Sequence, residues 1–141
     1  MSQPAPSNRV LLVDNDYRTS NRLADLLRDD GFEVDVVRDG AAAIAHLARS
    51  PLPDTLITEL TMRFVDGVSV ARYALAQRPG LRVVVLTGHP HLLRPGAMGT
   101  PPPLVLTKPL EYAQLLTALR APSPVSAGSL APISSSPAEK C

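Results

Sequence analysis

The sequence predicts an α/β fold in which a parallel sheet is covered by helices on both faces. Short apolar runs typical of strands, such as Arg9–Val13 and Arg82–Leu86, alternate along the chain with amphipathic segments of helical spacing. Strands and helices that alternate in this way form right-handed βαβ crossovers. In such a sheet the ligand site lies outside the carboxyl ends of the strands, so the residues after each strand are the first candidates for function.

The first predicted elements are a strand, a helix and a second strand. Arg9–Val13 is an uninterrupted apolar run, which is typical of a strand buried on both faces. Leucines between Leu23 and Leu27 repeat at helical spacing, and Gly31 ends the helix that they define. Phe32–Val37 then alternates between apolar and polar residues, which indicates a strand with one more polar side.

A second helix and a third strand follow. Asp39 is a good N-cap for a helix over Ala41–Ala48, because its carboxylate can accept hydrogen bonds from the first free amides of that helix. Pro53 precedes a third strand over Asp54–Glu59, which reads DTLITE.

The remaining elements bring the predicted strands to five. A helix begins at Asp66 and ends before Pro79. Apolar strand runs follow at Arg82–Leu86 and Leu104–Leu106. The last element is an amphipathic helix over Glu111–Leu119, which completes the alternation of strands and helices.

Composition narrows the class of protein. The length of 141 residues fits one domain. The formal net charge of +1 argues against a protein that holds nucleic acid by charge alone. No apolar run approaches the ~20 residues that span a bilayer, and the N-terminal residues lack the apolar centre of a signal peptide. The single cysteine, Cys141, cannot form an internal disulfide, which fits a cytoplasmic protein.

The 15 prolines are clustered and mark the ends of the expected domain. Residues 121–141 contain mainly Pro, Ser and Ala without apolar periodicity, so we expect a flexible tail there. Residues 1–8 are expected to form a flexible N-terminus, and residues 9–120 a single domain. Because no space for an output domain follows Arg120, this domain is expected to stand alone.

Polar side chains of reactive types follow four of the predicted strands. Asp14 and Asn15 come directly after the first strand, and Glu59 ends the third. Thr87 follows the fourth strand and Lys108 the fifth. Each residue alone is ordinary as a cap or turn residue, but the carboxyl ends of parallel strands bring such residues together. The complete set therefore predicts a site.

With these residues in view, the chain resembles the receiver domain of two-component response regulators. The resemblance extends from about Arg9 to Arg120 and rests on VLLVDND, DTLITELTMRFVDG, RVVVLTG and VLTKP at the first, third, fourth and fifth strands. It implies a five-stranded, flavodoxin-like domain that takes a phosphoryl group from a histidine kinase onto an aspartate. It also implies Mg²⁺ beside that aspartate, held by an acidic pair after the first strand.

The resemblance assigns roles to three side chains and leaves two positions altered. Asp14 matches the first acid of the pair, Thr87 the switch hydroxyl, and Lys108 the lysine that binds phosphoryl oxygens. Asn15 occupies the position of the second acid, and Glu59 that of the phospho-accepting aspartate. The metal ligands that the resemblance implies are therefore Asp14, Asn15, Glu59 and the backbone of Thr61.

The two altered positions predict weak chemistry. Glu is one methylene longer than Asp, so the Glu59 carboxylate lies about 1.5 Å further out, and a misplacement of ~1 Å can lower a rate ~100-fold. Asn15 offers an uncharged carbonyl oxygen to an ion that requires strict octahedral geometry. We therefore expect a weakened Mg²⁺ site, poor or absent phosphorylation and no enzymatic activity.

The longer carboxylate of Glu59 allows two interpretations. It can pair with Lys108 and simply satisfy the charge of that residue. Alternatively, it can reach toward Lys108 and Thr87 and imitate the anionic oxygens of a phosphorylated aspartate, which would hold the domain near its active state.

The output face implied by the resemblance is also altered. Between the fourth and fifth strands, where receivers normally have their fourth helix, the chain reads GHPHLLRPGAMGTPPP. Each interior proline destabilises a helix by ~3 kcal/mol and each glycine by ~1 kcal/mol, so we expect a loop in place of this helix. Val105 stands where many receivers carry an aromatic residue that moves with the threonine.

The sequence therefore predicts an atypical, stand-alone receiver that acts in phosphorelay signalling mainly by binding other proteins. Its expected partner is a histidine kinase or another two-component signalling protein, with a homodimer as a further option and with neither nucleic acid nor membrane. Two alternatives stay open, namely a phosphorylation-competent single-domain receiver and a flavodoxin-like domain that binds an unrelated small anion.

Overall fold

The computed structural model describes residues 8–49 and 51–121. Within them, five parallel strands form one sheet in the order β2-β1-β3-β4-β5. The strands are β1 (Arg9–Val13), β2 (Glu33–Val37), β3 (Thr55–Thr58), β4 (Arg82–Thr87) and β5 (Leu104–Thr107). The helices are α1 (Tyr17–Asp29), α2 (Gly40–Arg49), α3 (Gly67–Gln77) and α4 (Tyr112–Arg120). The predicted α/β class, with five parallel strands, is confirmed.

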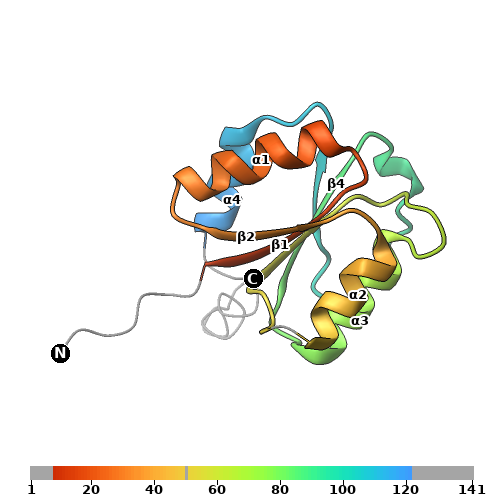
Figure 1. The fold of residues 1–141 in the computed structure, drawn as a ribbon. Coiled ribbons are helices and arrows are strands. Elements are labelled where there is room, and N and C mark those ends of the chain that lie inside the picture. The colour runs from red at the N-terminus through yellow and green to blue at the C-terminus, as the bar shows by residue number, and fades with distance from the viewer. Residues whose placement is uncertain (1–7, 50, 122–141) are drawn as a thin grey trace, which may run out of the picture.

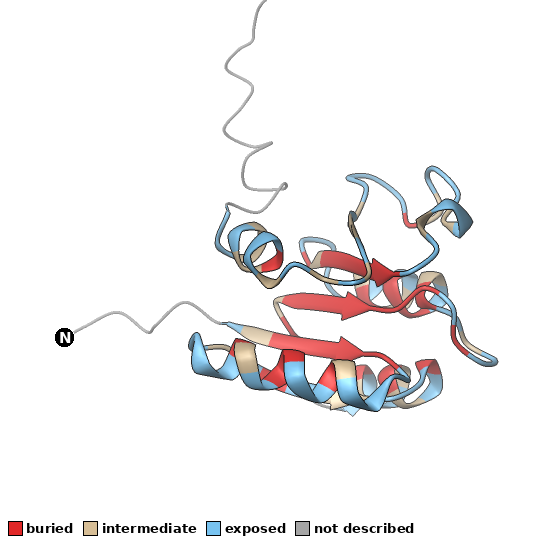
Figure 2. Cartoon of the chain, turned by 90° about the horizontal axis from the view of Figure 1, so that it is seen from above, coloured by how far each residue is buried: buried red, intermediate tan, exposed pale blue. Residues whose placement is uncertain are grey.

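The helices form two layers, one on each face of the sheet (Figure 1). α1 and α4 cover one face, where strand residues such as Leu12 and Val84 are buried. α2 and α3 cover the other face, which buries Leu11, Leu56 and Val85. Successive strand residues point to opposite faces, so each strand contributes to both cores. Figure 2 shows the central strands buried and the helices exposed on their outer sides, which makes the sheet a rigid support for its carboxyl edge.

Local sequence signals begin and end the helices as predicted. The Asp39 carboxylate accepts a hydrogen bond from the Ala42 amide at 2.7 Å, at the start of α2. The Asp66 carboxylate accepts one from the Ser69 amide at 2.9 Å, at the start of α3. Gly31, which follows α1, has a φ of +96°, a conformation that glycine adopts without strain.

Five predicted strand boundaries differ from the structure by one residue, namely the starts of β2 and β3 and the carboxyl ends of β3, β4 and β5. β3 stops at Thr58, so Glu59 is the first residue beyond the strand and not its last. β4 continues through Thr87, which pairs with Thr107 of β5. Strand ends depend on pairing with neighbouring strands, and the pattern within one strand does not define that pairing.

The connection between β4 and β5 contains no α-helix, which confirms that prediction. Its one helical turn is a short 3₁₀ helix over Pro90–Leu92. Between Gly88 and Pro103, Met98 is the only residue that is buried. β5 is therefore an edge strand with little cover, and Leu104 at its start is 39% exposed.

The two segments expected to be flexible, residues 1–8 and 121–141, lie outside the described residues except for Asn8 and Ala121. Both expectations stay predictions. Among the described helices, none is both long enough and apolar enough to cross a membrane.

Candidate functional site

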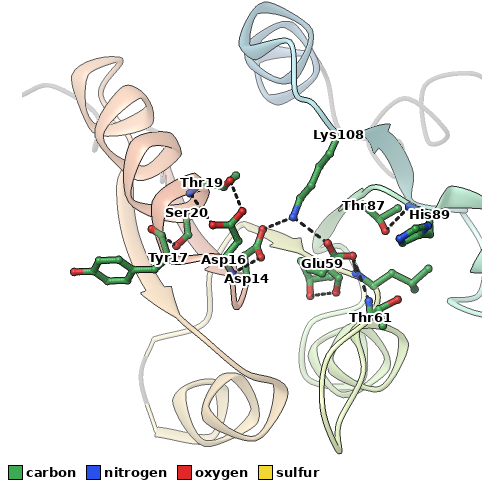
Figure 3. Close-up of polar contacts among 12 residues, drawn as sticks. Asp14, Asp16, Tyr17, Thr19, Ser20, Glu59, Thr61, Thr87, His89 and Lys108 are labelled. Atoms are coloured by element: carbon green, nitrogen blue, oxygen red, sulfur yellow. Dashed lines mark hydrogen bonds and ion pairs between the residues drawn. The ribbon is translucent and has the colours of Figure 1, made fainter.

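Four of the predicted site residues meet at the carboxyl edge of the sheet (Figure 3). Asp14 follows β1, Glu59 follows β3, Thr87 ends β4 and Lys108 follows β5. Because β1, β3, β4 and β5 are neighbours in the sheet, their carboxyl ends bring these side chains into one place. The acids, the hydroxyl and the lysine therefore form a single cluster, as their order along the chain predicted.

Lys108 lies at the centre of this cluster. Its Nζ is 2.9 Å from Asp14 Oδ2 and 3.0 Å from Glu59 Oε1 (Figure 3). The side chains of Asp14 and Glu59 are 1% and 11% exposed, so the ammonium neutralises two carboxylates that are largely removed from water. The predicted pairing of Glu59 with Lys108 is confirmed.

The second carboxylate oxygen of Glu59 is held by the backbone that follows it. Oε2 accepts hydrogen bonds from the Leu60 amide at 2.6 Å and from the Thr61 amide at 3.2 Å. Both carboxylate oxygens therefore have partners, and the side chain is fixed in one position. Side-chain patterns carry no signal for these two amides, so sequence reasoning missed them. The predicted role of the Thr61 backbone in holding a metal stays a prediction.

Thr87 is fully buried beside the ion pair. Its hydroxyl accepts a hydrogen bond from the His89 amide at 3.1 Å, and its carbonyl accepts one from the Lys108 amide at 2.9 Å. These bonds hold the Thr87 side chain in the cluster and join the end of β4 to the backbone of Lys108. Like the amides of Leu60 and Thr61, the His89 amide is a backbone donor at the site that the side-chain pattern did not indicate.

Asn15 and Asp16, the two residues after Asp14, have different surroundings. Asn15 is exposed. Asp16 caps α1, because its carboxylate accepts hydrogen bonds from the Thr19 amide at 3.3 Å and from the Thr19 hydroxyl at 2.7 Å. The Asp16 amide donates to Asp14 Oδ1 at 2.9 Å. The Asp16 carboxylate is therefore engaged at the start of α1.

Burial, hydrogen bonds and neighbouring charges shift the pKa values of Glu59 and Lys108. Burial raises the pKa of Glu59, but hydrogen bonds from Lys108, from the neighbouring Thr87 hydroxyl and from the Thr61 amide bring this pKa below its ordinary value of 4.5. Burial lowers the pKa of Lys108, but Asp14 and Glu59 outweigh that effect and raise it above the ordinary 10.5. Glu59 and Lys108 are therefore both charged at neutral pH.

Glu59→Gln is expected to flatten the acid side of the stability curve. The pKa of Glu59 is lower in the folded than in the unfolded protein, so its contribution is complete above about pH 4.5 and is lost as the pH falls through the folded-state pKa. Urea unfolding of both proteins at several pH values above and below 4.5 measures this loss. Equal slopes of unfolding free energy against pH in this range would contradict the lowered pKa.

A glycine at the start of α3 lies against the backbone of Glu59. A Cβ atom on Gly67 would be 2.3 Å from the Glu59 carbonyl oxygen and 3.0 Å from Leu60 Cα. The Gly67 amide also donates a hydrogen bond to the Leu60 carbonyl at 2.9 Å. The Asp66-Gly67 pair therefore both begins α3 and positions the chain that carries Glu59.

Gly67→Ala is expected to lower the free energy of unfolding by about 1–3 kcal/mol, because the Glu59 backbone must move to admit the methyl group. Gly80→Ala is the matched control, since a Cβ atom there meets no other atom within 4 Å. The control is expected to raise stability by about 0.4–1 kcal/mol through the unfolded chain. Urea unfolding compares the two, and equal effects would show that the close approach at Gly67 places no constraint on the site.

The family to which this arrangement belongs follows from comparison with known proteins. The family model described as the response regulator receiver domain matches residues 10–120. The chain belongs to the response regulator receiver domain family. The matched residues include Asp14, Glu59, Thr87 and Lys108, the cluster that the family resemblance predicts to be the phospho-acceptor region.

A curated relative of this receiver is a response regulator. The receiver is 30% identical over 116 residues to the response regulator MprA of Mycobacterium bovis (strain BCG / Pasteur 1173P2). The aligned region is 82% of this chain and 50% of MprA. The chain thus spans about half the length of that relative. It is a receiver domain of a two-component response regulator.

Solved receivers share the fold. A response regulator receiver protein from Sinorhizobium medicae is 32% identical in sequence and superposes with a TM-score of 0.73. The superposition covers 82% of this chain and 94% of that protein. The receiver domain of the sensor histidine kinase PA1611 from Pseudomonas aeruginosa is 24% identical in sequence and superposes with a TM-score of 0.66. This superposition covers 81% of this chain and 95% of that domain. That structure has a magnesium ion coordinated in its active site cleft. The two comparisons confirm the flavodoxin-like receiver fold.

The donors at the site of this receiver show whether they fit a magnesium ion. Mg²⁺ requires near-octahedral oxygen ligands at about 2.0–2.1 Å. Here the buried carboxylates of Asp14 and Glu59 are both bonded to the Lys108 ammonium. In residues 8–49 and 51–121, no group of three or more His, Cys, Asp or Glu side chains is placed to hold a metal ion. A Mg²⁺ ion bound through Asp14 and Glu59, with waters completing its octahedron, would have to compete with Lys108 for both carboxylates.

Proposed function

We propose that this receiver is an atypical one that acts mainly through contacts with other proteins and takes up phosphoryl groups poorly or not at all. The observation that carries the proposal is the position of Lys108, whose ammonium joins Asp14 to Glu59. The residue at the phospho-acceptor position therefore already has a cationic partner. We further propose that Mg²⁺ binds weakly and that this internal partner is the reason.

The contacts of Glu59 oppose its use as a nucleophile. Phosphoryl transfer depends on a carboxylate oxygen that is aligned with the donor phosphorus and free to attack it. One oxygen of Glu59 is bonded to Lys108, and the other to the amides of Leu60 and Thr61. Each of these bonds stabilises the anion in its present position and so lowers its reactivity toward a donor.

The same contacts support a second element of the proposal, in which Glu59 partly imitates a phosphorylated aspartate. Lys108 is the residue that the family resemblance assigns to the phosphoryl oxygens, and a Glu59 oxygen lies 3.0 Å from its Nζ. Glu59→Asp withdraws the carboxylate from Lys108 while keeping its charge. If the imitation holds, this variant changes partner affinity or oligomeric state, and unchanged values for both would refute it.

An exposed aromatic residue beside the site supports a role in protein binding. Phe64, in the loop between β3 and α3, is 98% exposed and has a φ of +64°. The Arg63 guanidinium lies over its ring, 5.7 Å from the centroid. A bulky residue in the left-handed region lowers stability, and full exposure removes the packing that would offset this. Aromatic residues of this kind anchor protein interfaces, so we propose that Phe64 contacts the partner.

Phosphorylation of the purified protein tests the proposal. Wild type is incubated with Mg²⁺ and a small-molecule phosphodonor, and its intact mass is measured. We expect no phosphoryl adduct. Glu59→Gln is the matched control, because it keeps the shape of the side chain but removes its nucleophile. An adduct in wild type that disappears in Glu59→Gln would overturn the proposal in favour of a phosphorylation-competent receiver.

The remaining functional predictions are part of the proposal. Receiver domains interact with histidine kinases and other signalling proteins, so we propose a partner of that class. The absence of enzymatic activity, the cytoplasmic location and the stand-alone character stay predictions of the sequence. Titration with inorganic phosphate examines the small-anion alternative, because an anion that binds tightly at Lys108 would have to displace Glu59 from it.

A further inference from the structure

An apolar groove lies at the end of the sheet opposite to Lys108 and Glu59. Its volume is about 490 Å³, and it is bordered by the end of α3, the first residues of β4 and β5, and the end of α4. Its wall includes the side chains of Leu75, Leu81, Val83, Met98 and Leu104. The groove is therefore separate from the phospho-acceptor region.

The groove exists because β5 is shorter than β4 and because a loop stands in place of a helix. Pairing between these strands begins at Val84 with Leu104, so Arg82 and Val83 have no partner in β5. The residues before β5 are Pro101–Pro103, which lack the amide hydrogens needed to extend the ladder. An apolar surface is thus left open beside the edge of the sheet.

The chain leaves α4, the last helix among the described residues, at this groove. Ala118 and Ala121, at the end of α4, form part of the groove wall. The Arg82 guanidinium donates hydrogen bonds to the carbonyl oxygens of both residues. Among the described residues that line the groove, Arg82 carries the only charge, and that charge is directed at the end of α4. The rest of the wall is neutral.

The residues that follow Ala121 in sequence match this neutral wall. From Pro122 to Ala138 no side chain is ionisable, and Val125, Leu130 and Ile133 supply large aliphatic groups. Such a segment can enter an apolar groove without removing a charge from water. A partner with a charged or strongly polar binding segment would find no matching group on the described wall.

We propose that residues 122–138 dock in cis into this groove, with the aliphatic side chains of Leu130 and Ile133 inside it. Because the segment is attached to the groove wall, its effective concentration at the groove is in the ~mM range. With an intrinsic Kd of about 0.1 mM, the segment would be docked about ten times as often as free. The docked segment covers the edge strand β5, which would otherwise offer unpaired backbone groups to other chains.

A spin label on the full chain tests this docking. The variant Ser129→Cys, Cys141→Ser has one cysteine, which carries a nitroxide, and methyl signals are recorded by NMR with the label oxidised and reduced. We expect the methyl signals of Val83 and Leu104 to lose about twofold or more of their intensity in the oxidised state. Val34, in the strand at the opposite edge of the sheet, is the internal reference and should lose less intensity than Val83 and Leu104.

Two further samples make the result decisive. Leu130→Ser, Ile133→Ser in the labelled chain should restore the groove signals, whereas the matched change Ser134→Ala, Ser135→Ala should leave them broadened. Equal intensities at Val83 and Val34 would overturn the proposal. Broadening that weakens on dilution, or that appears between labelled and isotope-enriched chains after mixing, would also overturn it, because the occupant would then be a second copy of this chain.

Discussion

Lys108→Met is expected to lower the free energy of unfolding by about 3–5 kcal/mol at neutral pH. The substitution leaves Asp14 and Glu59 as two neighbouring carboxylates, 1% and 11% exposed, without their shared cation. Methionine keeps an unbranched side chain of similar length, so the loss reports charge more than volume. In a domain with a total stability of about 5–15 kcal/mol, this change removes a large fraction of it.

Urea unfolding at constant pH measures this loss against a surface ion pair of the same protein. Arg120 lies 3.7 Å from Asp30, and their side chains are 58% and 35% exposed. Arg120→Met is therefore expected to change stability by less than about 1 kcal/mol. Adding Glu59→Gln to Lys108→Met should recover part of the loss, since one uncompensated charge is removed. A loss in Lys108→Met no larger than that in Arg120→Met would refute the bridging role of Lys108.

The double variant Asn15→Asp, Glu59→Asp is expected to gain phosphorylation by a small-molecule donor, with a rate at least ~100-fold above wild type. The shorter side chain at position 59 withdraws its carboxylate by about 1.5 Å, which frees it from Lys108 and aligns it as a receiver nucleophile. The new acid at position 15 supplies the negative charge that the site lacks. Intact-mass analysis over time gives the rate.

Single variants separate the two effects. Glu59→Asp alone restores the nucleophile without the acid, and Asn15→Asp alone restores the acid without the nucleophile, so each should give a much smaller gain than the pair. Asp14→Asn added to the double variant should abolish the adduct, because it removes a carboxylate from the restored site. If the double variant stays as inert as wild type, the two altered positions do not account for the lost chemistry.

Much of the fold was predictable because its signals are local. Asp39 and Asp66 accept hydrogen bonds from amides only three residues away, so the N-caps are visible in the sequence. The prolines and glycines between β4 and β5 exclude a helix by backbone chemistry alone, and the structure has only a 3₁₀ turn there. The site residues follow from the same logic, since parallel strands place their carboxyl ends together.

Other features depend on contacts between distant segments or on backbone groups, which a pattern of side chains does not specify. The second partner of Lys108, Asp14, is 94 positions away in sequence. The amides that hold Glu59 Oε2 are present at every non-proline residue, so nothing marks those of Leu60 and Thr61. The left-handed conformation of Phe64 is equally unmarked, because Phe is not a residue that favours it.

We propose that Lys108, which lies between Asp14 and Glu59, keeps metal ions from binding at the phospho-acceptor region. The most direct test is a titration of the wild-type protein with Mn²⁺, followed by electron paramagnetic resonance of the free ion, beside the Asn15→Asp, Glu59→Asp variant. We expect wild type to leave Mn²⁺ free at millimolar concentrations and the variant to bind one equivalent. Stoichiometric binding by wild type, as tight as that of the variant, would contradict this proposal.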